Sequence, residues 1–89
     1  MSENLSLSKT SPSVEDIKKD VLEFCLQPRR KEEILHYIQL EPRPYNYKKY
    51  IARLFQDRYL QHTIPQNPRS GLQQYIVTKK GLLYLKSIS

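Results

Sequence analysis

An apolar stripe at helical spacing follows the first dozen residues of the chain. Ser13 and Asp16 precede most of it in the arrangement of an N-cap, with the acid near the positive end of the helix dipole. Pro28 is expected to end the helix. We therefore predict a first amphipathic helix that begins at Ser13. Its inward residues are Val14, Ile17, Val21, Phe24 and Cys25.

A second, shorter helix is predicted from about Arg30 to Ile38. Glu32 and Glu33 lie in its first turn, where the helix dipole favours acids. No Ser, Thr, Asp or Asn stands at its start, so the N-cap is weak. The residues expected to face inward are Ile34, Tyr37 and Ile38.

Two prolines in residues 39–44 predict a turn between two crossing helices. A third helix follows from about Tyr45 to Arg58. With about 100° of rotation about the helix axis per residue, one stripe faces inward and a cationic face points outward. The inward stripe is Tyr47, Tyr50, Ile51, Leu54 and Arg58, flanked by Phe55. The outward residues are Tyr45, Lys49, Ala52 and Gln56, with Lys48 and Arg53 at the sides.

Two short segments after this helix favour β-strands. Tyr59–Ile64 is the first, and Gln73–Thr78 is the second, with Tyr75 and Val77 on one face. Residues 65–72 between them contain Asn-Pro and Ser-Gly, which are turn dipeptides. The two strands are therefore expected to form a hairpin with a long loop.

A last helix is predicted after the hairpin, with Thr78 as its cap and its end near Lys86. Leu82, Leu83 and Leu85 are its apolar residues. Gly81 in its first turn costs about 1 kcal/mol relative to Ala. A close approach of a neighbouring backbone would explain a glycine at this position.

The predicted order is helix, helix, turn, helix, strand, loop, strand and helix. This order is that of an α+β fold, the winged helix-turn-helix, with a three-helix core, a two-stranded hairpin as wing and a C-terminal helix. We assign residues 13–89 to this domain. Residues 1–12 are rich in Ser and lack periodicity, so we expect them to be a disordered tail or linker.

Charge is divided unevenly between the two halves of the chain. Residues 43–89 contain nine Lys or Arg and one acid, Asp57, whereas residues 1–42 contain six basic and eight acidic residues. The cations of the second half alternate with aromatic and aliphatic positions, which indicates a folded cationic face. The usual partner of such a face is a polyanion.

Length and composition exclude several classes of protein. A chain of 89 residues is one small domain, with too small a core to frame the cleft of a two-substrate enzyme. The single Cys25 excludes an internal disulfide framework and fits a reducing compartment. No signal peptide and no membrane-spanning apolar run are evident. We therefore expect a soluble, cytoplasmic protein with no membrane partner.

Four stretches of the sequence resemble a known family. They are the run from Gln27 to Ile34 (QPRRKEEI), the helix Tyr47–Leu54, Thr63-Ile64-Pro65 with Asn67-Pro68, and Tyr75–Gly81. Together they resemble the winged-helix domain at the C-terminus of Fic-type proteins and of ATP-dependent helicase-like transcriptional regulators. The resemblance covers about three quarters of the chain and departs from the family at Arg30, where relatives carry a small capping residue. It implies a winged helix with a DNA-binding role, appended to a larger protein, and no catalytic residue.

A winged helix with this charge predicts duplex DNA as the partner. The recognition helix is then expected to enter the major groove, and the cations around it are expected to contact phosphates. Asn46, Lys49, Arg53 and Gln56 carry donors suited to base edges. Tyr45 at the helix start is suited to phosphate, as are the cations Arg43, Lys48 and Arg69. The predicted DNA-binding residues are Arg43, Tyr45, Asn46, Lys48, Lys49, Arg53, Gln56 and Arg69.

Other interpretations of these residues stay open. A basic helix face is often only solvated, and Arg69 can serve merely to keep a loop soluble. Tyr47 and Tyr50 are expected to be core residues, whereas Tyr45 is open between core and contact. The same fold also serves protein–protein contact or dimerisation, through Tyr45 and the apolar residues 82–85, and the same basic surface suits RNA.

No catalytic or metal site is predicted. One cysteine with His36 and His62 is too small a set for a structural zinc site. The two glycines form no phosphate-binding loop. Glu32 and Glu33 are adjacent on a helix and point in different directions, so they are not a catalytic carboxylate pair. We therefore expect no enzyme activity, no cofactor and no small-molecule substrate.

Overall fold

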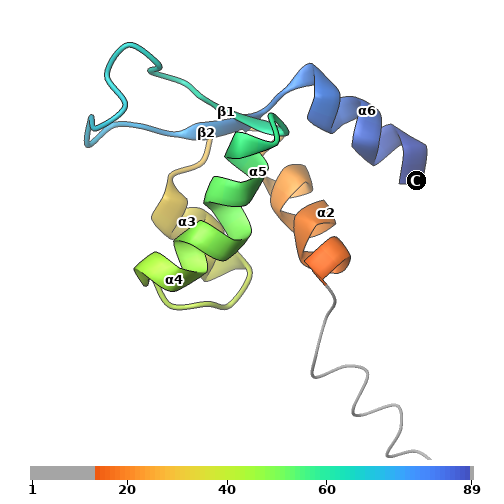
Figure 1. The fold of residues 1–89 in the computed structure, drawn as a ribbon, viewed down its shortest axis with the longest axis horizontal. Helices are drawn as coiled ribbons and strands as arrows, with labels where there is room; N and C mark the ends of the chain where they lie inside the picture. The colour runs from red at the N-terminus through yellow and green to blue at the C-terminus, as the bar shows by residue number, and fades with distance from the viewer. Residues whose placement is uncertain (1–13, 89) are drawn as a thin grey trace, which may run out of the picture.

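The computed structural model of the chain describes residues 14–88 (Figure 1). The predicted tail at 1–12 and the predicted cap Ser13 lie outside the described residues. Helices and one small antiparallel sheet make up the described part, which confirms the α+β class and the predicted order. The elements are α2 (Val14–Phe24), α3 (Lys31–Tyr37), α4 (Pro44–Tyr47), η1 (Lys48–Ala52), α5 (Arg53–Gln56), β1 (Leu60–His62), β2 (Tyr75–Val77) and α6 (Lys79–Ile88).

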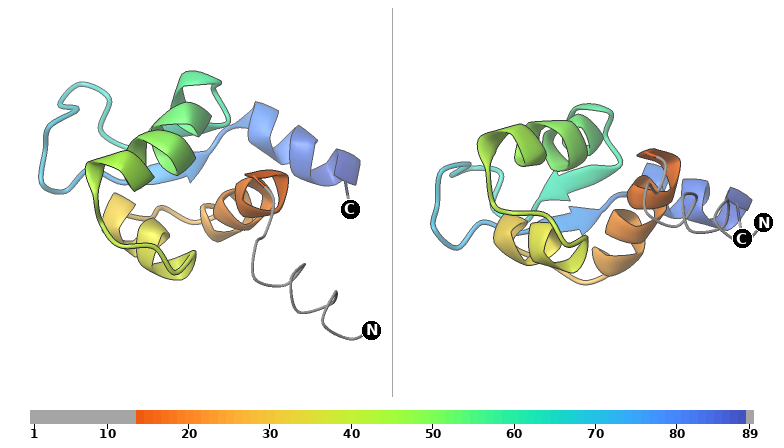
Figure 2. Two further views of the ribbon diagram at one scale, coloured as in Figure 1. Left: turned by 60° about the horizontal axis from the view of Figure 1, so that its bottom comes forward. Right: turned by 90° about the horizontal axis from the view of Figure 1, so that it is seen from below.

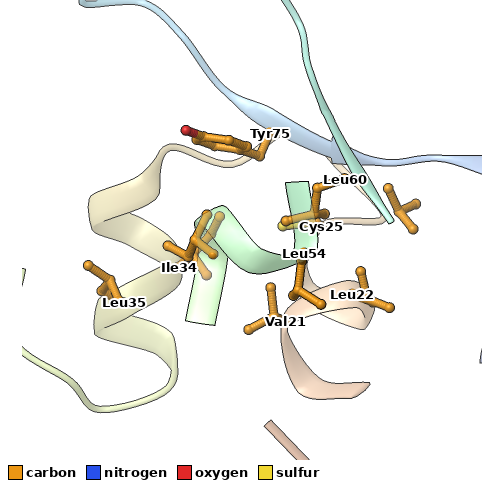
Figure 3. Packing of buried hydrophobic residues seen from close by; sticks show 10 residues of the cluster. Val21, Leu22, Cys25, Ile34, Leu35, Leu54, Leu60 and Tyr75 are labelled. Carbon is orange, nitrogen blue, oxygen red and sulfur yellow. The ribbon is translucent and has the colours of Figure 1, made fainter. Parts of the chain in front are cut away.

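One hydrophobic core joins the helices to the hairpin (Figure 3). The predicted stripe of α2 is confirmed by Val21 and Cys25, which are fully buried, while Ile17 and Phe24 pack against the core. Leu22 is fully buried as well, although the stripe did not predict it. The core consists of Val21, Leu22, Cys25, Ile34, Leu35, Ile51, Leu54, Leu60, Tyr75 and Val77.

Burial also decides the chemistry of Cys25. It raises the pKa of the thiol to about 12, against a smaller opposing effect of Arg29. The thiol is therefore protonated at neutral pH and lacks the thiolate form that reacts as a nucleophile. The prediction that Cys25 faces inward is confirmed by its position in the core.

Two details of the first helices differ from the prediction. α2 ends at Phe24, because residues 25–27 already form a turn before Pro28. The prediction that Tyr37 faces inward is wrong: its side chain is 50% exposed and its ring stacks on Phe24, with 4.2 Å between the ring centroids. Leu35 occupies the core instead and is 2% exposed.

The start of α3 is held without a capping side chain of the usual type. The backbone N–H of Arg30 donates to the Glu33 carboxylate, with 2.8 Å between the nitrogen and Oε1. This bond is half of a capping box. The other half is missing because the guanidinium of Arg30 has no acceptor to offer. The predicted weakness of this cap is thus correct.

The third predicted helix is a continuous helical run, 44–56, with an irregular middle. Its residues 48–52 form a π-helical turn, η1, which a regular spacing does not predict. Ile51 and Leu54 are buried, as predicted. The prediction that Arg58 continues the inward stripe is wrong. Arg58 lies beyond the end of the helix, with φ 67° and an exposed side chain. The helix ends there in a Schellman motif, in which the N–H of Tyr59 donates to the carbonyl of Leu54 at 2.9 Å.

The sheet is a two-stranded antiparallel hairpin in which Leu60 pairs with Val77 and His62 with Tyr75. Both strands are shorter than predicted. Beyond His62 one more backbone bond joins Thr63 to Gln74 at 3.0 Å. The loop is then held by the side-chain amide of Gln73, which bonds both backbone groups of Ile64 at 2.8 Å. A further antiparallel bridge joins Tyr75 to Arg29, so the segment between α2 and α3 also pairs with β2.

Aromatic rings pack where the hairpin meets the helical run. The ring of His62 stacks on Phe55 at 4.2 Å and meets the edge of Tyr75 at 5.0 Å. The hydroxyls of Tyr47 and Tyr75 are hydrogen-bonded at 2.8 Å. Burial lowers the pKa of His62 below its ordinary value of 6.5.

The last helix, α6, extends away from the hairpin loop, and the two lie at opposite ends of the molecule (Figures 1 and 2). Thr78 caps it as predicted, because its hydroxyl accepts from the N–H of Gly81 at 3.1 Å. The Tyr84 hydroxyl donates to Glu15 of α2 at 2.6 Å, and this bond raises the pKa of Tyr84 to about 12. Lys18 lies over the rings of both Tyr59 and Tyr84.

Gly81 is buried because a neighbouring backbone comes close, as predicted. A Cβ built there would meet the side chain of Val77 and would lie 2.7 Å from the carbonyl oxygen of Tyr59. We expect Gly81→Ala to lower the free energy of unfolding by about 1–3 kcal/mol, measured by urea denaturation. Gly71→Ala is the matched control, because nothing lies within 4 Å of that position. Equal effects of the two substitutions would contradict this explanation.

The partly buried ring of His62 makes stability depend on pH. Its folded pKa lies below 6.5, so the unfolded chain binds the proton more readily. The contribution of His62 is therefore fully present above pH 6.5 and is lost as the pH falls through the folded pKa. We expect Tm to fall between about pH 7.5 and pH 5, and to fall less in His62→Phe, which keeps a ring against Phe55. Equal decreases in the two proteins would show that His62 is not responsible.

Candidate nucleic-acid interface

The outward face of the helical run carries most of the predicted DNA-binding residues. Because Ile51 and Leu54 are anchored in the core, the opposite side chains are turned to solvent. Tyr45 is 68% exposed, which answers the question that the sequence left open between core and surface. Lys49 is also exposed and is not covered by the hairpin. The exposed members of the predicted set on this run are Tyr45, Lys48, Lys49, Arg53 and Gln56.

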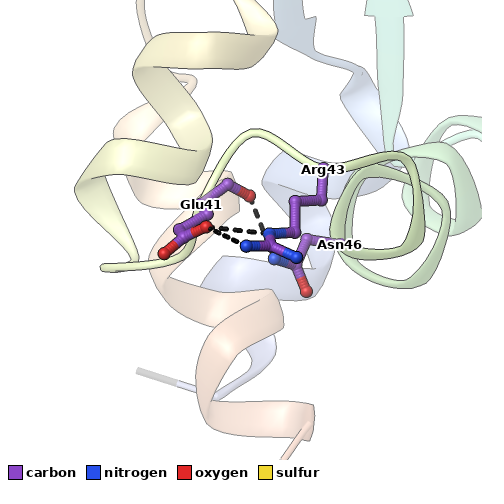
Figure 4. A network of polar contacts seen from close by, with 3 residues as sticks. All are labelled: Glu41, Arg43 and Asn46. Carbon is purple, nitrogen blue, oxygen red and sulfur yellow. Dashed lines mark hydrogen bonds and ion pairs between the residues drawn. The ribbon is translucent and has the colours of Figure 1, made fainter.

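Two predicted residues are engaged at the turn before α4 (Figure 4). The guanidinium of Arg43 binds the Glu41 carboxylate through Nε and Nη2, both at 2.8 Å from Oε1. The side-chain amide of Asn46 donates to the Glu41 carbonyl at 2.9 Å. Asn46 therefore holds the turn with the donor that was predicted for a base edge. Arg43 stays exposed, but its charge is partly balanced by the acid.

Lys49 and Arg53 lie on the side of the run that faces α2. The ammonium of Lys49 is over the rings of Tyr50 and Tyr45, at 5.3 and 5.7 Å from their centroids. Interaction with Tyr50 and then Tyr45 raises the pKa of Lys49, so the side chain is charged at any physiological pH. Arg53 pairs with Asp57 at 3.5 Å on the exposed surface.

A shallow hollow lies between these residues and α2. Its volume is about 230 Å³, and its lining includes Lys49, Arg53, Glu15 and Asp57. Acids and cations therefore alternate on this side of the run. The positive field there is weaker than the excess of cations in the second half of the sequence predicts.

Arg69 lies apart from the helical run, on a second and larger groove. This groove, here named the α3–loop groove, has a volume of about 580 Å³. The start of α3, residues 68–71 of the hairpin loop and the rings of Tyr47, His62 and Tyr75 form its walls. Arg69 lines it together with Arg30 and Lys31, which brings three cations from two separate segments to one groove.

Arg30 and Lys31 were not predicted as functional residues. They lie in residues 1–42, where the acids outnumber the cations. A comparison of the net charge of the two halves of the chain therefore does not point to them. A sequence signal for them exists in the consecutive cations Arg29, Arg30 and Lys31. Arg29 itself is engaged elsewhere, because its Nε donates to the carbonyl of Phe24 at 2.9 Å.

Lys80 has a structural role at the start of α6. Its ammonium donates to the carbonyl of Asp57 at 2.8 Å, just past the end of α5. A cation at the C-terminal end of a helix is favourable with the dipole of that helix. This contact gives a reason for a cation in the first turn of α6, where its own helix dipole disfavours it.

The described part of the chain, residues 14–88, holds no group of three or more His, Cys, Asp or Glu placed to bind a metal ion. Within the same residues, no helix has the length and apolarity needed to cross a bilayer.

Comparison with known proteins places the fold. No protein-family model matches the chain, and no curated protein matches it. The solved structure of a Fic family protein from Desulfovibrio desulfuricans G20 matches 88% of this chain with a TM-score of 0.66 and 20% sequence identity. The match spans 24% of that protein's chain. This likeness shows that the chain has the same fold as one part of a Fic family protein.

Proposed function

We propose that this chain is a winged helix that binds duplex DNA and catalyses no reaction. In this proposal the helical run 44–56 is the recognition helix and the hairpin loop 63–74 is the wing. The observation that carries the proposal is the fixed orientation of the run. Ile51 and Leu54 are buried at 0% and 6% exposure, so a face with three cations, Lys48, Lys49 and Arg53, is held toward solvent.

The arrangement of the strands supports the winged-helix interpretation. The hairpin follows the recognition helix directly, and its second strand also pairs with Arg29, two residues before α3. The N–H and carbonyl of Arg29 bond the carbonyl and N–H of Tyr75 at 2.9 and 2.6 Å. A wing anchored in this way has a defined position beside the recognition helix.

The exposed residues divide into two kinds of contact. Lys49, Arg53 and Gln56 carry donors for base edges in the major groove. Lys48, Arg43 and Tyr45 suit phosphates, and Asn46 is reassigned to holding the turn on which Arg43 stands. With about four to six phosphates neutralised, log K is expected to fall with log salt at a slope of about −4 to −5.

A protein partner is the second candidate, because α6 carries exposed apolar side chains. Leu82, Leu83 and Ile88 are 46%, 58% and 44% exposed. In this alternative the helix contacts another domain or a second copy of the chain. A sedimentation coefficient that rises with protein concentration, together with no affinity for duplex DNA at low salt, would favour it. Duplex and single-stranded RNA, compared with DNA at one salt concentration, test the same basic surface for RNA.

The recognition helix is tested by the double substitution Lys49→Ala and Arg53→Ala. We expect more than a tenfold loss of affinity for duplex DNA in an electrophoretic shift, because two charged contacts are removed. Tm is expected to stay the same, since both side chains are exposed. Lys79→Ala with Lys86→Ala removes the same charge from α6 and serves as the control. Equal losses from both pairs, or no loss from the first, would exclude the helical run as the contact surface.

A further inference from the structure

The α3–loop groove is lined by three cations that form no ion pair with another described residue. Arg30, Lys31 and Arg69 form no ion pair within residues 14–88, in contrast to Arg43 and Arg53, which pair with acids of their own neighbourhood. Lys31 lies over the ring of Tyr47, with 5.1 Å between the ammonium and the ring centroid. The groove therefore offers three cations whose charge is not taken up by an ion pair.

One wall of the groove is built to keep its shape. The Gln73 amide bonds both backbone groups of Ile64 and also donates to the carbonyl of Asn67 at 3.0 Å. The Ser70 hydroxyl accepts from the N–H of Leu72 at 3.1 Å. These bonds order the loop that carries Arg69 before any ligand arrives. Less conformational entropy is then lost when a ligand binds.

Two tyrosines also line the groove. Tyr47 and Tyr75 share a hydrogen bond at 2.8 Å, in which either oxygen can be the donor. Burial, and then this bond, raise the pKa of Tyr75 above its ordinary value, so the hydroxyl remains protonated. Three cations, with the one hydroxyl proton that this pair of tyrosines leaves unshared, suit an oxyanion such as phosphate.

We propose that this groove binds the phosphate backbone of the same duplex, with Arg30 and Lys31 on one wall and Arg69 on the other. The proposal rests on the proposed function and adds contacts to it. Its position supports a shared ligand, because Tyr47 lines the groove and is followed on the helix by the exposed Lys48. A strand that crosses the recognition helix at its start would continue into the groove.

Glu32 is the one acid that lines this groove among the described residues. Its side chain is exposed and makes no ion pair within residues 14–88. A carboxylate at this place repels a phosphate backbone. Removal of its charge is therefore expected to strengthen binding, which distinguishes a site for polyanions from an inert cationic surface.

The first arm of the test is the double substitution Arg30→Ala and Lys31→Ala, with duplex DNA titrated by fluorescence anisotropy at several salt concentrations. Two lost phosphate contacts are expected to make the log–log salt slope shallower by about 2. The α6 pair Lys79→Ala and Lys86→Ala is the control for net charge and is expected to leave the slope unchanged. A change of the same size in the α6 pair would overturn the proposal, because the effect would then be one of net charge.

The second arm is Glu32→Gln, which keeps the size of the side chain and so preserves the fold. A several-fold gain in affinity is expected, while Asp20→Asn, which removes an exposed acid of α2 outside the groove, is expected to give none. An unchanged slope in the first arm, or an unchanged affinity for Glu32→Gln, would overturn the groove proposal. If Lys49→Ala with Arg53→Ala still weakens binding, the proposed function survives that result. If the unmodified chain does not bind duplex DNA at low salt, both proposals fail.

Discussion

Tyr75 is the residue on which the arrangement of the domain depends. Its backbone pairs with Arg29 on one side and with His62 on the other, and its ring is 5% exposed. Its hydroxyl bonds Tyr47 of the helical run. One residue thus joins the start of α3, the run and the hairpin. In a small domain with little core, such a junction determines the positions of the surrounding surfaces.

The helical run depends on that junction and on two buried side chains. Ile51 and Leu54 in the core determine which residues meet solvent, so the orientation of the cationic face is a consequence of hydrophobic burial. The π-helical turn at 48–52 lies in the middle of this face. Such turns alter the direction of the side chains that follow, and they are frequent at functional sites.

Electrostatics divides the cations of this domain into two groups. Arg43 and Arg53 have acidic partners at exposed positions, where a pair contributes little to stability but reduces the local field. Arg30 and Arg69 have no such partner among the described residues, and they meet at a groove with an ordered wall. The strength of a cationic surface therefore depends on which charges remain uncompensated, more than on their number along the chain.

Local patterns in the sequence determined the order of the elements, the stripe of α2, the cap at Thr78 and the need for glycine at position 81. These follow from periodicity and from backbone sterics, which act between near neighbours. Only the tertiary structure decided that Leu35 replaces Tyr37 in the core, that Asn46 holds a turn, and that Arg30 and Arg69 line one groove. The physical reason is that contacts between residues distant in sequence arise from the packing of whole elements, and a one-dimensional pattern carries no record of those distances.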